Sequence, residues 1–247
     1  NKRGVNMFEV VPFTDIGVVR ETNEDNLVFL VGEFQGEEIA LIVVCDGMGG
    51  LDDGENASRT VCQNLEETFA NEEYETIAEL KRAITMSITM SNKQLLNINM
   101  AKGKKGGTTV SCVLLADKGY LWHVGDSRIY QIKDGQVNRL TEDHTLVNKY
   151  IKDGDITEEE AKTHHQRNVI LRAVGIKAGV KIDTNTFDYK DSSLVLCSDG
   201  FWHSLEDRQL VDLNNKHVSL NDLFQFAIAE GETDNITSVF VEHKSTN

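Results

Sequence analysis

The 247-residue sequence predicts an α+β fold in which β-strands come in consecutive blocks with helices between them. Apolar runs typical of strands follow one another directly in several parts of the chain. Short turns that contain glycine or Asp-Gly join many of these runs, which favours antiparallel pairing. Two long segments carry apolar residues at helical spacing. Together these observations favour the α+β class over an alternating βαβ fold.

The first block combines three predicted strands with two helices. Strands are expected at Met7–Val11 and Leu27–Val31, and the unbroken apolar run Ile39–Cys45 predicts a strand that is buried on both faces. Apolar residues then recur every four positions from Ala57 to Phe69, and a similar pattern covers residues 77–95. Each pattern forms one stripe of an amphipathic helix, so the block ends in a helix pair.

Strands return after the two glycines at 106 and 107. They are predicted, in chain order, at Thr108–Leu115, Tyr120–Val124, Arg128–Ile132, Gln136–Leu140, Val180–Asp188, Leu194–Cys197 and Ile236–Glu242. The dipeptide Asp134-Gly135 predicts a tight hairpin. Helices are predicted at Thr157–Thr163, where a Thr-x-x-Glu cap occurs in an otherwise polar stretch, and near Asp207–Leu213 and Leu220–Glu230.

The charge balance excludes several classes of partner. The chain has 25 Lys and Arg against 40 Asp and Glu, a formal net charge of −15. Nucleic acids and anionic membrane surfaces both require a positive surface, so neither is an expected partner. With 40% hydrophobic residues the composition is that of a globular domain, which excludes general disorder. No apolar stretch approaches the ~20 residues of a membrane helix.

The cysteines favour a reducing compartment. Three of the four, Cys45, Cys112 and Cys197, lie inside apolar runs, and no two form a CxxC pair. A free thiol in an apolar run behaves as a small core residue, whereas disulfides and zinc ribbons need paired spacing. The N-terminal residues NKRGVNMFEVV carry no apolar signal-peptide core. We therefore expect a cytoplasmic protein.

Four aspartates stand at the ends of apolar strands. Asp46 and Asp199 follow the runs IALIVVC and SLVLCS, Asp126 follows YLWHVG, and Asp234 precedes the last strand. Any one of them could be ordinary turn chemistry. Carboxylates on neighbouring strands, about 5 Å apart, would repel one another and need a cation between them. A site with oxygen ligands alone favours Mg²⁺ or Mn²⁺.

The residues around these aspartates carry a family resemblance. Eight segments occur in order and span nearly the whole chain: TDIGVVRETNEDN (14–26), VVCDGMGG (43–50), GGTTVSCVLL (106–115), HVGDSRIY (123–130), LTEDHT (140–145), NVILRAVG (168–175), LCSDGFW (196–202) and TDNITSVFV (233–241). In these segments the chain resembles the metal-dependent protein phosphatases, the type 2C serine/threonine phosphatase family. The DGMGG and DHT variants resemble its bacterial branch.

The resemblance implies an αββα sandwich of two antiparallel β-sheets flanked by helix pairs, in one catalytic domain over residues 1–247. It also implies two Mg²⁺ or Mn²⁺ ions. Asp46 would bridge them, and the carbonyl of Gly47 would bind one. Asp199 and Asp234 would complete the first ion's ligands, and Glu24 would bind the second, directly or through water.

Further roles follow from the same resemblance. Arg20 would hold the substrate phosphate, and Asp126 together with Asp199 would hold a third, weaker ion. Asp25 would orient ligands or waters without touching the ions. Two divalent ions reverse the local sign of charge and make a bridging hydroxide available near neutral pH. That hydroxide would attack phosphorus in line, with no phosphoenzyme, while Arg20 neutralises charge on the phosphoryl group.

Other interpretations of single residues stay open or are disfavoured. Arg20 could be a surface ion-pair partner of Glu21 or Glu24, and Arg128 is expected to pair with a nearby acid. Ser127 and Ser198 lack a G-x-S-x-G elbow, which disfavours a serine hydrolase. The glycines at 47, 49 and 50 are not followed by Lys-Ser/Thr, so a P-loop is not supported.

The sequence does not identify which group would protonate the leaving group. Some relatives have a histidine that can act as general acid after the first Asp-Gly, but Met48 stands there and cannot donate a proton. His144 is a candidate for the site, with a structural hydrogen-bonded role as its alternative. A charged stretch at about residues 146–170 resembles the family's mobile flap and contains His164 and His165, which could contact substrate or be solvated.

The expected function is metal-dependent hydrolysis of phosphoserine and phosphothreonine in phosphoproteins. The substrates would be those of a serine/threonine kinase, and the enzyme would be a monomer. One alternative is a catalytically silent family member that acts as a regulatory binding module, and another is a phosphatase of small phosphate esters. Because Asp46, Gly47, Asp199 and Asp234 are all present, the catalytic interpretation is favoured.

Overall fold

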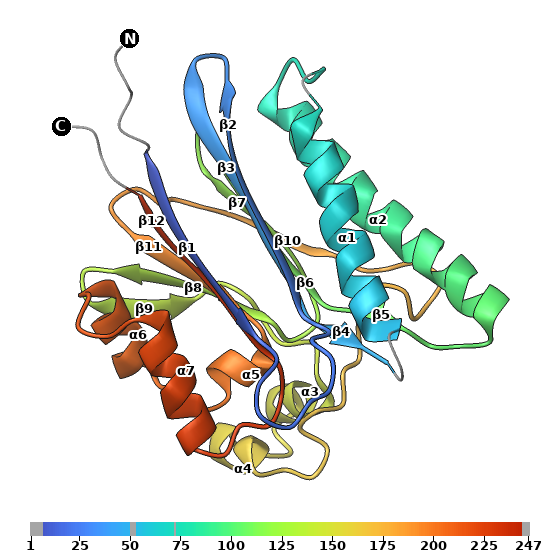
Figure 1. Ribbon diagram of the computed structural model, residues 1–247, viewed down its shortest axis with the longest axis vertical. Helices are drawn as coiled ribbons and strands as arrows, with labels where there is room; N and C mark the ends of the chain where they lie inside the picture. The colour runs from blue at the N-terminus through green and yellow to red at the C-terminus, as the bar shows by residue number, and fades with distance from the viewer. Residues whose placement is uncertain (1–6, 50–52, 72, 244–247) are drawn as a thin grey trace.

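Two antiparallel five-stranded sheets lie face to face at the centre of the molecule, as Figure 1 shows for this computed structural model. The structure describes residues 7–49, 53–71 and 73–243. The first sheet has the order β1-β12-β11-β8-β9, and the second has the order β10-β7-β6-β3-β2. Neighbouring strands within each sheet are antiparallel throughout. The expected α+β class and its two-sheet architecture are therefore confirmed.

The strand bounds match the predicted runs within a few residues. The first sheet consists of β1 (Phe8–Asp15), β12 (Ile236–His243), β11 (Ser193–Cys197), β8 (Arg128–Lys133) and β9 (Gln136–Arg139). The second consists of β10 (Asp183–Phe187), β7 (Gly119–Val124), β6 (Val110–Leu115), β3 (Glu37–Cys45) and β2 (Asn26–Phe34). A short ladder pairs β4 (Gly47–Met48) with β5 (Gly107–Thr108).

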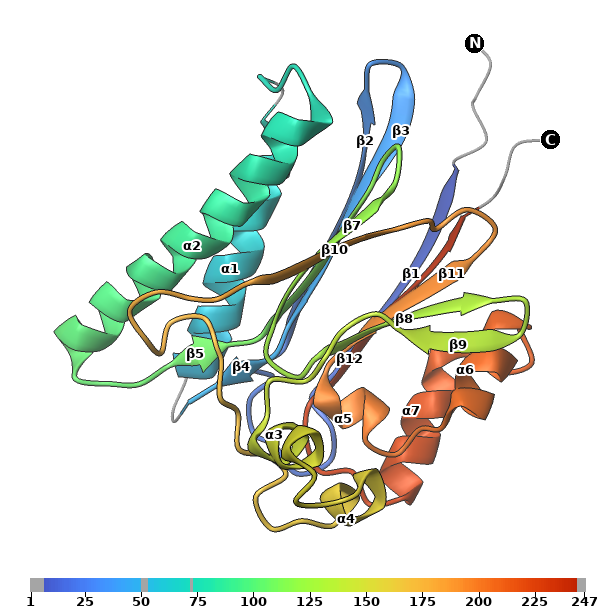
Figure 2. The same cartoon turned by 180° about the vertical axis from the view of Figure 1, so that it is seen from behind.

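Helices cover both outer faces of the sandwich. The pair α1 (Asp53–Ala70) and α2 (Ile77–Lys102) covers the second sheet. On the first sheet lie α5 (Asp199–Trp202), α6 (Asp207–Asn214) and α7 (Leu220–Ala229). Figure 2 shows the remaining helices, α3 (Leu146–Asp153) and α4 (Glu158–Lys162), at one end of the sandwich beside α5.

Strand β3 explains how the layers hold together. Its side chains alternate: Ala40, Ile42 and Val44 enter the core between the sheets, whereas Leu41 and Val43 enter the core beneath α1 and α2. Because both faces of β3 are buried, its sequence has no polar positions between residues 39 and 45. The prediction of a strand buried on both faces is confirmed.

Several local predictions are also confirmed. Asp134 and Gly135 both have positive φ, at 51° and 73°, and connect β8 to β9 in a two-residue hairpin. The four cysteines are buried and free. Among the described helices, none is both long and apolar enough to cross a membrane.

Three elements were not predicted. Helix α3 lies in the polar, charged stretch for which only the helix at Thr157–Thr163 was predicted; it begins after a Thr145 cap and ends at Gly154 in the left-handed conformation. Helix α5 is only one turn long, and β4 is only two residues long. Elements this short carry too few apolar repeats to produce a periodic signal.

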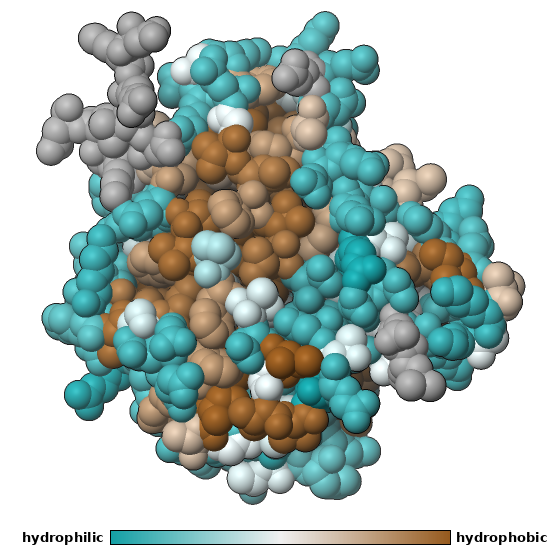
Figure 3. Space-filling view, viewed as in Figure 1, coloured by the Kyte–Doolittle hydropathy of each residue, from teal (hydrophilic) through white to brown (hydrophobic). Residues whose placement is uncertain are grey.

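The two edge strands β1 and β2 lie on the same side of the sandwich. Figure 3 shows apolar side chains gathered on this face, and Val11, Phe29 and Val31 are each more than 40% exposed there. The opposite edge carries β10 and β9. The sandwich is thus open at its sides, and the ends of its central strands meet at the end where Figure 1 places β4, α3 and α5.

Candidate metal centre

Carboxylates from both sheets meet at this end of the sandwich. Asp46 directly follows β3 of the second sheet, and Asp199 directly follows β11 of the first. Asp126 lies between β7 and β8, and Asp234 lies two residues before β12. Burial raises the pKa of Asp46 well above its usual range, and the charges of Asp199, Asp25, Asp126 and Asp234 raise it further. The sequence-predicted acids are therefore electrostatic neighbours.

Burial and neighbouring charges also raise the pKa values of the other buried acids. Burial raises the pKa of Asp126 well above its ordinary value, and the charge of Asp199 adds to the shift. Burial raises the pKa of Asp25 to about 7. The pKa of Asp199 is raised mainly by burial, although a hydrogen bond to Asp46 opposes the shift. Such carboxylates need either protons or a cation at neutral pH.

One atom shows this need directly. The Oδ1 atom of Asp126 is buried and has no hydrogen-bond partner among the described residues. A buried carboxylate oxygen without a donor is costly unless a cation satisfies it. Together with a donor set made of carboxylate oxygens, this orphaned atom fits a hard divalent ion such as Mg²⁺ or Mn²⁺.

The carboxylates do not all converge on one point. Within the described part of the chain, no three His, Cys, Asp or Glu side chains are arranged as a ready metal site. Asp234 Oδ2 instead accepts a hydrogen bond of 2.6 Å from Arg20 Nη2. Glu24 accepts a hydrogen bond from the backbone of Gly54 at the start of α1. Asp234 is thus paired with another predicted site residue, whereas Glu24 is held by the backbone of α1.

Arg20 lies at the open edge of this centre. Its side chain is 48% exposed, and Asp234, its ion-pair partner, is 34% exposed. The partner is thus neither Glu21 nor Glu24, the neighbours in sequence. The guanidinium comes from the loop between β1 and β2, whereas Asp234 comes from the segment before β12. A cationic group that is partly exposed beside buried acids can bind an incoming anion.

Asn235 fixes the loop that carries Arg20 and Glu24. Its Oδ1 accepts from the backbone N–H of Glu24 at 2.9 Å, and its Nδ2 donates to the carbonyls of Ile16 (2.9 Å) and Thr22 (3.1 Å). The residue is only 4% exposed. One buried amide therefore ties the N-terminal loop to the C-terminal strand, although the sequence analysis did not single it out.

Gly47 lies where three segments pack closely against one another. Its N–H donates to the Glu24 carbonyl at 3.1 Å. A Cβ atom on Gly47 would lie 2.5 Å from that carbonyl oxygen and would also collide with the carbonyl of Gly54. Only glycine fits between Glu24 and the start of α1, so packing requires the glycine of the Asp-Gly pair. Gly50 of the same motif lies outside the described residues.

The turn that carries Asp126 is held from two sides. Thr109 Oγ1 lies 2.6 Å from Ser127 Oγ and accepts from the backbone N–H of Asp46 at 2.9 Å. Trp202 Nε1 donates to the carbonyl of Asp126 at 3.0 Å. Thr109 and Trp202 were not identified as functional residues from the sequence, although both lie in quoted motifs. Their role depends on contacts between distant segments, which leave no local pattern.

The remaining predicted residues have structural partners. Ser198 Oγ donates to Asp25 Oδ2 at 2.8 Å, so neither Ser198 nor Ser127 is available as a nucleophile. Arg128 forms an ion pair of 2.6 Å with Asp143, which confirms the expected structural role. Met48 lies in β4.

The predicted histidines lie apart from the carboxylates. His144 is 5% exposed and lies behind Gly125, whose N–H donates to its Nδ1 at 3.0 Å. His164 packs against Tyr150 and His165, with ring centroids 5.8 and 4.5 Å apart. These contacts assign no proton donor.

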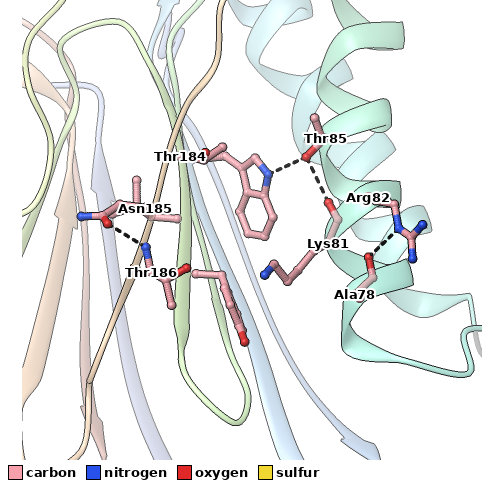
Figure 4. A pocket seen from close by; sticks show the side chains of 10 residues that line it. Ala78, Lys81, Arg82, Thr85, Thr184, Asn185 and Thr186 are labelled. Atoms are coloured by element: carbon pink, nitrogen blue, oxygen red, sulfur yellow. Dashed lines mark hydrogen bonds between the residues drawn. The ribbon is translucent and has the colours of Figure 1, made fainter.

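A separate hollow lies between α2 and the edge strand β10. It encloses about 630 Å³ and is lined on one side by Lys81, Arg82 and Thr85, and on the other by residues 184–186. Figure 4 shows the Lys81 ammonium turned into this space, 3.8 Å from the ring centroid of Tyr120. None of the strand-end carboxylates lines it, so it is separate from the candidate metal centre.

Comparison with known proteins agrees with this geometry. Residues 20–237 match the family model described as protein phosphatase 2C. The serine/threonine phosphatase stp of Listeria monocytogenes is 30% identical over 243 residues, which cover 94% of this chain and 95% of that protein. The protein phosphatase PhpP of Streptococcus pneumoniae is 30% identical over 240 residues, 94% of this chain and 96% of its own.

Solved structures show the same similarity in three dimensions. The serine/threonine phosphatase Stp1 from Staphylococcus aureus superposes with a TM-score of 0.87 at 32% identity, covering 99% of this chain and 100% of that one. The catalytic domain of the phosphatase PstP in complex with two manganese ions superposes with a TM-score of 0.76 at 27% identity, covering 96% and 99%.

The two-sheet fold with carboxylates gathered at its strand ends thus belongs to the metal-dependent protein phosphatases. The chain is a member of the protein phosphatase 2C family of serine/threonine phosphatases, and its relatives include the bacterial Stp and PhpP proteins.

Proposed function

We propose that this protein removes phosphate from phosphoserine and phosphothreonine residues of phosphoproteins with the help of two Mg²⁺ or Mn²⁺ ions. The observation that carries the proposal is the cluster of buried carboxylates, whose pKa values are raised by burial and by one another. A cluster of this kind is stable at neutral pH when divalent cations balance it.

The proposed ligands follow from the placement of the acids. Asp46 directly follows β3 and would bridge both ions, with the Gly47 carbonyl on one of them. Asp199 and Asp234 would complete the ligands of that ion, and Glu24 would serve the second. For Asp234, ion binding would compete with its contact to Arg20.

A third, weaker ion is proposed at Asp126 and Asp199, because the buried Oδ1 of Asp126 is without a donor. Asp25 receives a hydrogen bond from Ser198 and is proposed to orient ligands or waters. Bound divalent ions would lower the pKa of coordinated water and balance the negative charge of the phosphate.

The protein's own groups bind and orient the substrate. Arg20 is exposed enough to receive a phosphate group and can direct two N–H groups at its oxygens. When it does so, its hydrogen bond to Asp234 must weaken, which leaves that carboxylate free to bind cations. The exposed arginine and the buried acids would therefore separate two tasks: recognition of the phosphate and retention of the metal.

The segment at about residues 146–170 is proposed to act as a flap on one catalytic domain. It begins and ends at an antiparallel bridge between Thr145 and Ile170, so its two ends are held to each other. Helices α3 and α4 lie within it. We further propose that the protein is a cytoplasmic monomer acting on the substrates of a serine/threonine kinase.

The decisive experiment is hydrolysis of a phosphothreonine peptide with Mn²⁺ and with EDTA. We expect turnover with Mn²⁺ and none with EDTA. Turnover in EDTA would refute the metal mechanism, and no turnover in either would support the silent binding module. p-Nitrophenyl phosphate measured in parallel separates the third possibility: a much higher kcat/KM for it than for the peptide would indicate a phosphatase of small esters.

A further inference from the structure

His144 makes polar contacts through both ring nitrogens inside the protein. Its side chain is only 3% exposed. Nδ1 lies 3.0 Å from the backbone nitrogen of Gly125, and Nε2 lies 3.0 Å from Oδ2 of Asp183, the first residue of β10. Neither contact involves a strand-end carboxylate of the centre. The ring therefore connects the turn at Gly125 to the start of β10.

The backbone contact defines the tautomer. A backbone N–H can only donate, so Nδ1 must accept the Gly125 N–H with its lone pair. The proton of the neutral ring is then on Nε2, where it donates to Asp183. The pKa of His144 is lowered by burial, which keeps the ring in this neutral form. Protonation of Nδ1 would place two donors against each other.

Arg172 completes the arrangement. Its Nη1 donates to Asp183 Oδ1 at 3.0 Å and lies 3.0 Å from His144 Nε2. Arg172 and the His144 ring thus contact the two oxygens of the same Asp183 carboxylate. The backbone N–H of Leu171 also donates to the His144 carbonyl at 2.7 Å. Residues 171 and 172 directly follow the proposed flap, so its end is attached to His144.

On the side away from His144, Gly125 is packed tightly against Thr109. Gly125 has φ of +111°, and a Cβ there would lie 2.5 Å from Cγ2 of Thr109. The backbone N–H of His144 donates to the Gly125 carbonyl at 2.8 Å. Gly125 thus lies between Thr109 and His144, and the next residue is Asp126, whose buried Oδ1 has no donor. The orientation of the Asp126 carboxylate therefore depends on the backbone conformation at Gly125.

We propose that His144 is a positioning residue that fixes the Asp126 carboxylate for cation binding through the Gly125 N–H, with Asp183 and Arg172 holding the ring. This rests on the proposed third ion at Asp126. It adds that the strength of this ion site depends on a ring whose other contacts lie outside the centre.

The test compares two substitutions of the ring. His144→Asn keeps an acceptor oxygen near the position of Nδ1, whereas His144→Leu has similar bulk and no acceptor. Mn²⁺ binding is measured by titration calorimetry on the whole protein, together with hydrolysis of the phosphothreonine peptide. Asp126→Asn identifies which binding step belongs to Asp126.

We expect His144→Leu to weaken the step lost in Asp126→Asn by roughly 10-fold or more, the usual effect of removing a partner that orients a ligand. The tighter steps should be unchanged, and His144→Asn should recover most of the affinity. Equal weakening in both His144 variants, or no weakening in His144→Leu, would overturn the proposal. Lack of tight Mn²⁺ binding and of turnover in the unsubstituted protein would instead contradict the proposed function.

If circular dichroism shows that His144→Leu does not fold, Arg172→Met provides the second test. Arg172 is 35% exposed, so its replacement leaves the core intact. It removes one of the two groups that hold Asp183, and the same Mn²⁺ step should weaken by a smaller factor. Unchanged binding in this variant would contradict a role of Arg172 and Asp183 in holding the ring.

Discussion

At the scale of single residues, the centre is a compromise between burial and charge. Asp46, Asp126 and Asp199 occupy positions where an aliphatic side chain would be more stable in the isolated fold, because burial and mutual repulsion raise their pKa values. Their backbones are nevertheless held by neutral partners such as Thr109. The side-chain charge can therefore be changed without removing the contacts that define the local fold.

Removing one charge from the centre should lower activity but raise thermal stability. We expect Asp46→Asn and Asp199→Asn each to lower turnover of the phosphothreonine peptide by roughly 10²-fold or more, because a metal ligand is lost. In EDTA the same variants should unfold at a higher temperature, because like charges no longer repel. Asp134→Asn, in the β8–β9 hairpin, is the matched control and should change neither quantity. Unaltered turnover in both centre variants would rule out the proposed ligands.

The lowered pKa of buried His123 predicts that the stability of the protein depends on pH. Burial lowers its pKa to about 4 from 6.5, so between these values the unfolded chain binds more protons than the folded one. This residue's contribution to stability is full above pH 6.5 and is lost as pH falls towards 4. The shift corresponds to about 3 kcal/mol at most. Buried carboxylates with raised pKa values contribute the opposite slope, so a difference between variants must be measured.

The variant for this measurement is His123→Gln, which keeps a donor for the Glu142 carbonyl that Nε2 contacts at 3.1 Å. Urea unfolding in EDTA at pH 5 and pH 7 gives the free energies. We expect the unsubstituted protein to lose more stability than the variant on going from pH 7 to pH 5. An equal loss in both proteins would show that folding does not lower the pKa of His123.

The sequence identified the acids of the centre but not what holds them. Asp46 and Asp199 were predictable because each ends an apolar strand, and strand ends of a sheet must meet. Asn235, Trp202 and Thr109 hold backbone groups up to 219 residues away in sequence, and such contacts produce no periodicity. The polar partners of Asp25 and Asp126 could be assigned only in three dimensions.

At the scale of elements, regular strands and long helices were predictable and short connections were not. Strand β3 and helix α2 repeat their apolar pattern over many residues, and α2 also has a Thr76 cap at its start and Gly103 at its end. Helix α5 owes its place to the packing of Phe201, which is fully buried beneath α6 and α7. Tertiary contacts decide such an element, and a four-residue window cannot indicate them.

The junction of β2, β4 and α1 gives a prediction at this scale. Gly47→Ala should destabilise the protein by about 2–3 kcal/mol, because its Cβ would collide with the carbonyls of Glu24 and Gly54. Gly32→Ala in β2 is the control: its Cβ would lie 3.4 Å from Phe69, an ordinary contact. That variant should stay within about 1 kcal/mol of the unsubstituted protein. Urea unfolding in EDTA measures both, and equal effects would contradict the packing argument.

At the scale of the whole molecule, cation binding should be coupled to folding. The raised pKa values mean that the folded centre is most stable when protonated, and that this stability is lost as pH rises through about 7. A divalent ion stabilises the ionised form instead. We expect Mn²⁺ to raise the unfolding temperature more at pH 7.5 than at pH 5. The same shift at both pH values would contradict a centre made of these carboxylates.

The pairing of β1 with β12 has a consequence for synthesis. Phe8 lies opposite His243, and Arg20 meets Asp234, so residues more than 200 positions apart must come together before the centre is complete. A ribosome delivers the N-terminal strand long before its neighbour. During that interval β1 lacks the strand it pairs with, and Asn235 has not yet joined the loop of Arg20 and Glu24. The phosphatase should therefore acquire activity only after β12 has been synthesised and inserted beside β1.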